Sequence, residues 1–230
     1  MVTQLQSPEK SKIIYPDDNG EAMSNNTEQF RLIVEIKENL ELVFANDPNV
    51  FIAGDLLWYP VEGNNKICQA PDVMVVFGVP KGYRGSYQQW LENDIAPQVV
   101  FEIWSEESIC ILTKRFQFCD RYGVEEYYFY NPQTLELGGW LRIEGEFEAI
   151  EQMDGWVSPR LGVRFQLSET ELEMFRPSGE AFMSFGELDR LRQKAEVRSQ
   201  QAEMMLEQER SRSQALESKL REMGIDPNQL

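Results

Sequence analysis

The segment PDVMVVF at residues 71–77 and the segment QVVFEIW at residues 98–104 decide the fold. Both are short runs rich in β-branched and aromatic residues, which is typical of buried strands. Asp72 opens the first run, and Glu102 stands in the middle of the second. A buried charge is costly without a partner, and a divalent cation shared by two carboxylates on neighbouring strands would compensate it. Such a pair is the smallest frame for an Mg²⁺ ion that activates water against a phosphodiester.

The same pattern has a second interpretation that needs no metal. Glu102 could form a buried ion pair with Lys114 or Arg115, while Asp72 only caps a turn. Short motifs of this kind also occur by chance, so the spacing leaves both interpretations open. Asp55 is a further candidate acid near the site, although a polar residue at a strand turn is the simpler explanation for it.

Histidine is absent from the chain, and this excludes several chemistries. A Ser-His-Asp triad, a Cys-His pair and a zinc site with histidine ligands all require it. The three cysteines are too few for a four-cysteine zinc site. Any bound metal would therefore be held mainly by oxygen atoms, which indicates Mg²⁺ or Mn²⁺.

The charge of the chain weighs against tight, non-specific DNA binding. The formal net charge is −17, and residues 1–186 carry 14 Lys and Arg against 30 Asp and Glu. DNA binding depends on basic side chains that meet phosphates. The odd number of cysteines predicts reduced thiols. Because the chain also lacks an apolar run of about 18 residues, we expect a cytoplasmic protein without a membrane span.

Apolar periodicity and turn residues predict an α/β (α+β) fold with a mixed sheet and flanking helices. Three helices are expected. The first begins at a cap on Asn26 or Thr27 and ends near residue 46, the second lies around Tyr87–Leu91, and the third covers Thr113–Tyr122. The expected strands are Val50–Ala53, Leu56–Tyr59, Val73–Phe77, 98–104, Tyr127–Tyr130, Leu137–Ile143, Phe147–Ile150 and, as the last strand, Val163–Leu167.

The composition changes at about Glu187, after which no Gly or Pro occurs before Gly224. This indicates a long, charged helix, so we expect a lead-in at 1–24, a core domain at 25–185, a helix at 186–223 and a tail at 224–230. The seam of a coiled coil would contain Leu188, Leu191, Ala195, Ala202, Met205, Leu206, Leu216 and Leu220, interrupted by Arg198, Glu209 and Arg212. A self-paired dimer and a single charged helix both fit this weak heptad.

Several longer stretches resemble one family of bacterial proteins. They are PDVMVVFGVPKGYRGSYQQW, IAPQVVFEIWSEES, KRFQFCDRYGVEEYYFYNP, GGWLR and GWVSPRLGVRFQLS, which lie between about residues 15 and 180. They resemble the Uma-type family of the PD-(D/E)xK nuclease superfamily. The resemblance implies a restriction-endonuclease-like core and a metal-dependent DNA endonuclease. It also implies metal ligands at Asp72, Glu102 and the carbonyl of Ile103.

The sequence departs from the family pattern beside the second acid. The motif places a lysine two residues after this acid, where Trp104 stands, and the lysine that the family supplies from the following helix falls on Arg115, beside Lys114. Glu106 and Glu107 enter the intervening loop, either as charges that repel phosphate or as extra metal ligands. Two functions follow as hypotheses: an Mg²⁺-dependent endonuclease in which Lys114 or Arg115 stabilises the phosphate, or an inactive relative that acts as a scaffold through its C-terminal helix.

Overall fold

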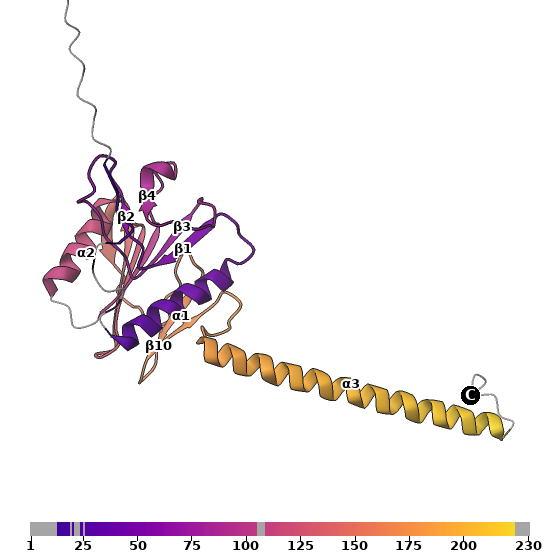
Figure 1. Cartoon of the computed structure of the whole chain (residues 1–230). Helices are drawn as coiled ribbons and strands as arrows, with labels where there is room; N and C mark the ends of the chain where they lie inside the picture. The colour runs from indigo at the N-terminus through magenta and orange to yellow at the C-terminus, as the bar shows by residue number, and fades with distance from the viewer. Residues whose placement is uncertain (1–12, 19, 21–23, 25, 105–108, 224–230) are drawn as a thin grey trace, which may run out of the picture. The chain divides into compact units, whose positions relative to one another are not determined.

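The computed structural model describes residues 13–18, 20, 24, 26–104 and 109–223. The chain divides into two compact units, Met1–Phe182 and Met183–Leu230. The first unit contains a mixed sheet and its flanking helices, and the second contains the long helix α3, Phe185–Glu222 (Figure 1). The α/β fold class expected from the sequence is confirmed.

The helices of the first unit are α1 (Thr27–Val43), α2 (Ile109–Arg121) and the single-turn 3₁₀ helix η1 (Gln89–Leu91). Its strands are β1 (Val50–Gly54), β2 (Trp58–Tyr59), β3 (Val73–Phe77), β4 (Tyr87–Gln88), β5 (Val99–Ile103), β6 (Glu126–Asn131), β7 (Glu136–Ile143), β8 (Glu146–Ala149), β9 (Arg164–Leu167) and β10 (Leu172–Phe175).

The main sheet has six strands in the order β1-β3-β5-β6-β7-β8. All neighbouring pairs are antiparallel except β5 and β6, which run parallel. The parallel pair needs a crossover connection, and α2 supplies it. Asp72 directly precedes β3 and Glu102 lies in β5, and these two strands are neighbours in the sheet.

The sheet has a hydrophobic cluster on each face. Alternate residues of β3 point to opposite sides, so that Val73 and Val75 join one cluster while Met74 and Val76 join the other. Leu32, Ile33, Ile36 and Leu40 of α1 pack in the first cluster. Cys119 of α2 is buried in the second, together with the partly buried Phe116 and Phe118. The two helices therefore cover opposite faces and hold β3 and β5 between them (Figure 1).

Asn26 is the N-cap of α1 and is one of the two positions expected for this cap. Its side-chain oxygen accepts a hydrogen bond of 2.9 Å from the backbone N–H of Gln29. This bond satisfies one of the free N–H groups of the first helical turn. It also fixes where Gln29 stands on the helix, and Gln29 faces the site described below.

The segment around Tyr87 differs from the sequence expectation. A helix was expected around Tyr87–Leu91, but Tyr87 and Gln88 form β4, which runs parallel to β2. Tyr87 is fully buried, its N–H bonds to Leu57 O at 2.7 Å and its hydroxyl bonds to Ile95 O at 2.6 Å. Burial of this aromatic side chain decides the local structure, and only Gln89–Leu91 turns helically.

Three other expectations need correction. The strand expected at Leu56–Tyr59 covers only Trp58–Tyr59, after a left-handed turn at Asp55 with φ of 48°. The helix expected at Thr113–Tyr122 begins at Ile109. Val163–Leu167 is not the last strand, because Leu172–Phe175 pairs with it as the antiparallel partner β10.

Part of the expected lead-in packs against the core. The Tyr15 ring lies 5.3 Å from that of Tyr59 and 4.8 Å from that of Trp90, centroid to centroid. The Tyr59 hydroxyl donates to Pro16 O at 2.9 Å. These contacts attach residues 13–18 to the β2 region. In the described part of the chain, no helix has the length and apolar character needed to cross a membrane.

Candidate active site

Asp72 and Glu102 face each other at the junction of β3 and β5. The antiparallel register pairs Val73 with Phe101, and continuing it by one residue places Asp72 across from Glu102. Asp72 is 3% exposed and Glu102 is 1% exposed. Two acids that are distant in the sequence are therefore buried side by side.

Asp72 is fixed by the backbone of β5 and by α1. Its Oδ2 accepts a hydrogen bond of 2.6 Å from the backbone N–H of Ile103. The amide nitrogen Nε2 of Gln29 lies 3.4 Å from Oδ1 of Asp72, 3.3 Å from Oδ2 and 3.0 Å from the carbonyl oxygen of Ile103. The Asp72 carboxylate and the Ile103 carbonyl thus converge on one point.

Glu102 is held by a cation and by an amide. The Arg115 guanidinium donates from Nη1 to Oε2 of Glu102 at 2.6 Å, and Gln69 donates from Nε2 to Oε1 at 3.0 Å. The same Nη1 of Arg115 lies 3.8 Å from Oδ1 of Asp72. Both carboxylates are therefore within ion-pair distance of a single nitrogen atom.

The charged form of Glu102 is destabilised in this environment. Burial raises its pKa well above the usual range, and the nearby Asp72 raises it further, while Arg115 and Gln69 oppose the shift. Burial also raises the pKa of the Cys119 thiol, and the charge of Glu102 raises it further. Water is largely excluded here, so the two acids need positive charge nearby to remain ionised together.

Comparison with known proteins identifies the family of the chain. A model of the Uma2 family, described as "putative restriction endonuclease", matches residues 2–178. The chain belongs to the Uma2 family. The family expected from the sequence is thus confirmed. A solved structure of a "putative nuclease" from Anabaena variabilis aligns with 58% of the chain and 72% of its own length, at 16% identity and a TM-score of 0.44. No curated protein matches the chain.

The other residues predicted for the site differ in how they lie relative to Asp72 and Glu102. Arg115 is half-buried and faces both acids, whereas Lys114 is exposed. In the described part of the chain, no ion pair joins Lys114 to either acid. Asp55 is close through its backbone, because its N–H bonds to the carbonyl oxygens of Pro71 and Asp72 at 3.1 and 3.2 Å. The expected candidates Glu106 and Glu107 lie outside the described residues.

Trp104 occupies the position of the motif lysine and has a packing role. Its backbone N–H bonds to Tyr130 O at 2.8 Å. Its ring meets that of Phe129 edge to face at 5.6 Å. The indole extends the aromatic packing beside the site and offers no cation. Arg115 alone, among the described residues, brings a positive side chain to the two acids.

Two residues of the site were missed by sequence reasoning, Gln29 and Gln69. Gln29 is 3% exposed on α1 and lies 43 residues before Asp72 in the chain. A buried glutamine in an amphipathic helix is a signal in itself, because its amide needs partners. The sequence does not show that position 29 faces inward until the helix is placed on the sheet.

The donor atoms at this site fit a hard divalent cation. The Asp72 carboxylate, the Glu102 carboxylate and the Ile103 carbonyl supply only oxygen, the ligand type that Mg²⁺ prefers. The Gln29 amide nitrogen marks a point that the Asp72 and Ile103 oxygens already share. Within the described ranges, no group of three or more His, Cys, Asp or Glu side chains could hold a metal. Water would have to complete the coordination.

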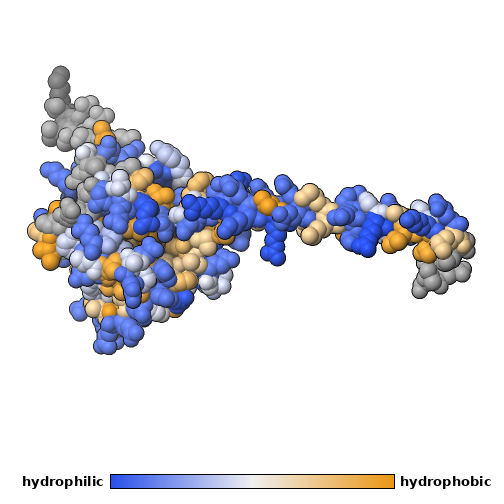
Figure 2. Space-filling view, turned by 90° about the horizontal axis from the view of Figure 1, so that it is seen from below, coloured by the Kyte–Doolittle hydropathy of each residue, from blue (hydrophilic) through white to orange (hydrophobic). Residues whose placement is uncertain are grey.

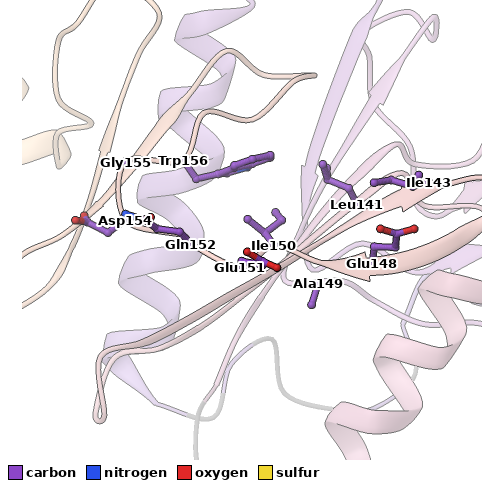
Figure 3. Close-up of a pocket in the computed structure, with 10 residues that line it drawn as sticks. All are labelled: Leu141, Ile143, Glu148, Ala149, Ile150, Glu151, Gln152, Asp154, Gly155 and Trp156. Carbon is purple, nitrogen blue, oxygen red and sulfur yellow. The ribbon is translucent and has the colours of Figure 1, made fainter.

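A separate cavity beside the β7–β8 hairpin does not take part in this site. Its volume is about 450 Å³, and Figure 3 shows the Trp156 and Ile150 side chains beside it. Three carboxylates, Glu148, Glu151 and Asp154, stand among its lining residues. This acidic lining is unfavourable to a phosphate group, so the cavity is not a continuation of a DNA-binding surface.

Proposed function

We propose that this Uma2 protein is a metal-dependent DNA endonuclease. The observation that carries the proposal is the position of Asp72, which shares Nη1 of Arg115 with Glu102 and Nε2 of Gln29 with the Ile103 carbonyl. Asp72, Glu102 and Ile103 would hold Mg²⁺ or Mn²⁺. When bound, such an ion lowers the pKa of a coordinated water and stabilises charge on a phosphate. The three free cysteines favour a cytoplasmic setting.

Arg115 would act on the phosphate. Its side chain is 21% exposed, so the guanidinium reaches solvent while it contacts the buried acids. Arginine stays protonated and presents several N–H donors in a plane that matches phosphate oxygens. It is unsuited to accept a proton. The proposed role is therefore charge stabilisation during cleavage, while the Glu102 carboxylate would be shared between Arg115 and a metal.

The experiment is plasmid nicking by the full-length protein with Mg²⁺ or Mn²⁺ at low salt. Low salt matters because salt screens the contacts of the few basic side chains with phosphate. The wild type should nick the plasmid, and Asp72→Ala should lose at least about 100-fold in rate. Asp120→Ala is the matched control, because Asp120 lies on the surface of α2 in an ion pair with Arg142.

A second candidate function is a scaffold that keeps the nuclease fold without cleavage. The observation that favours it is the Arg115–Glu102 ion pair, which satisfies Glu102 without a metal. The departures from the family pattern in the sequence at 105–108 and the acidic charge point the same way. If the folded wild type and the folded Asp72→Ala variant both fail to nick the plasmid, the result contradicts the endonuclease function and favours the scaffold.

A further inference from the structure

The helix α3 carries apolar side chains that nothing in its own unit covers. None of its 38 residues is buried. Leu191 is 48% exposed, Met205 69%, and Leu216 54%. Figure 2 shows such side chains spaced between hydrophilic ones along the helix. A helix of this kind gains stability when a partner covers its apolar positions.

A heptad repeat places Leu191, Met205 and Leu216 on one seam. With Leu188 at position a, the a positions are Leu188, Ala195, Ala202, Glu209 and Leu216, and the d positions are Leu191, Arg198, Met205, Arg212 and Lys219. Four of these ten seam positions are charged. The charges are unfavourable in a buried seam unless the partner compensates them, and they therefore select the partner and its direction.

A parallel, in-register pair of α3 helices is disfavoured by charge. In that arrangement each a or d residue faces its own copy. Glu209 would meet Glu209, and Arg198, Arg212 and Lys219 would each meet themselves. Like charges in contact at an interface cost several kcal/mol. The seam would contain four such layers.

An antiparallel pair with the a position of one chain opposite the d position of the other removes these conflicts. In one alignment Glu209 faces Arg198 of the second copy, and Leu216 faces Leu191. Ala202 then faces Met205, Ala195 leaves room for the long side chain of Arg212, and Leu188 faces Lys219, so that no like charges meet in the seam. Shifting the alignment by one heptad in either direction separates Glu209 from Arg198 and Leu216 from Leu191.

We infer that α3 binds a second copy of this chain as an antiparallel two-helix coiled coil, in the register set by Glu209 and Arg198. By symmetry this opposite-charge contact occurs twice. The amino ends of the two helices lie at opposite ends of the pair, about 55 Å apart at 1.5 Å per residue. Each copy therefore attaches its Uma2 unit at a different end of the coiled coil. This inference does not depend on catalysis by either unit.

Charge exchange in the full-length protein tests the inference. Glu209→Arg places arginine against Arg198 twice, and Arg198→Glu places glutamate against Glu209 twice. Each variant should raise the dimer dissociation constant at least about tenfold, as measured by light scattering over a dilution series. The double variant, which exchanges the two charges, should restore the wild-type constant. A parallel dimer predicts no such rescue, since each charge faces its own copy in every variant.

Disulfide trapping provides a readout that does not depend on affinity. In a Cys110→Ser background, which removes the exposed native thiol, Leu191→Cys and Leu216→Cys are made as separate proteins of different tagged size. The antiparallel register predicts a disulfide between one Leu191→Cys chain and one Leu216→Cys chain. It predicts no disulfide between two copies of the same variant. A monomeric wild type, self-linking of Leu216→Cys, or single charge variants that dimerise like the wild type would each overturn the inference.

Discussion

Nη1 of Arg115 lies 2.6 Å from Oε2 of Glu102, at a site where Glu102 is almost fully buried. The same nitrogen lies 3.8 Å from Oδ1 of Asp72. One guanidinium thus lies within ion-pair distance of both acids that the proposed endonuclease would use for its metal. The ion pair preserves the geometry of the acids and supplies a cation that can meet phosphate. It also competes with a bound metal for Glu102.

Replacing Arg115 with methionine should destabilise the protein and increase its dependence on metal. Loss of the guanidinium leaves Glu102 as a buried acid without a cation, at a cost of about 3 kcal/mol in the free energy of unfolding. Added Mn²⁺ should restore part of that free energy, and restore more than it adds to the wild type. Urea denaturation with and without Mn²⁺ measures both effects.

Arg160→Met is the control for this substitution. Arg160 pairs with Glu125 on the surface, where the two side chains are 44% and 40% exposed. An exposed ion pair contributes at most about 1 kcal/mol, and Mn²⁺ should not affect the result. Equal losses in Arg115→Met and Arg160→Met would contradict the role assigned to Arg115.

Gln29 should determine how tightly the site binds a cation. Gln29→Met keeps the approximate size of the side chain but removes its bonds to Asp72 and Ile103, at a cost of about 1.5–3 kcal/mol in stability. Gln29→Glu places a third carboxylate at the shared point, so it should destabilise the metal-free protein and tighten Mn²⁺ binding about tenfold. Calorimetry measures the stability and the Mn²⁺ affinity of both variants. Weaker Mn²⁺ binding by Gln29→Glu than by the wild type would contradict the placement of Gln29 at the metal site.

The stability of the first unit should depend on pH through Glu126. Burial raises the pKa of this carboxyl above its usual 4.5, although Ser158, Tyr128 and the Arg160 backbone N–H donate hydrogen bonds to it. The folded protein therefore keeps a proton that the unfolded chain has lost. This contribution is fully present below pH 4.5 and decreases as pH rises through the folded-state pKa.

The comparison variant for Glu126 is Glu126→Gln, whose amide does not titrate. Its hydrogen bonds shift the stability by an amount that does not depend on pH. The difference in unfolding free energy, wild type minus variant, should therefore decrease from pH 4.5 towards neutral pH. Urea midpoints across that range measure it. Parallel curves for the two proteins would show that Glu126 ionises as easily in the folded state as in the unfolded chain.

The acids of the site were readable from the sequence because each interrupts or opens an apolar strand. Asp72 and Glu102 needed only the strand pattern, and Arg115 needed the alignment of its helix with the family. The strand pairing then brings the two acids together without further information. The spacing left open whether a cation or a metal compensates Glu102, and the structure contains the Arg115 contact.

The remaining site residues depend on contacts between elements that are distant in the sequence. Gln29 and Gln69 are ordinary polar residues in the sequence, and their roles depend on the packing of α1 and of the turn before β3. Tyr87 shows the same limit in the fold, because its burial against β2 overrides a local helical pattern. Leu172–Phe175 is a strand only because β9 pairs with it.

Metal titration of the full-length protein tests the central claim most directly. Isothermal calorimetry with Mn²⁺ should detect one site per chain in the wild type. Asp72→Asn, which keeps the size of the side chain but removes its charge, should weaken this binding at least about 100-fold while the protein remains folded by circular dichroism. Wild type and Asp72→Asn with the same affinity for Mn²⁺, or a wild type that binds none, would contradict the assignment of Asp72 and Glu102 as metal ligands.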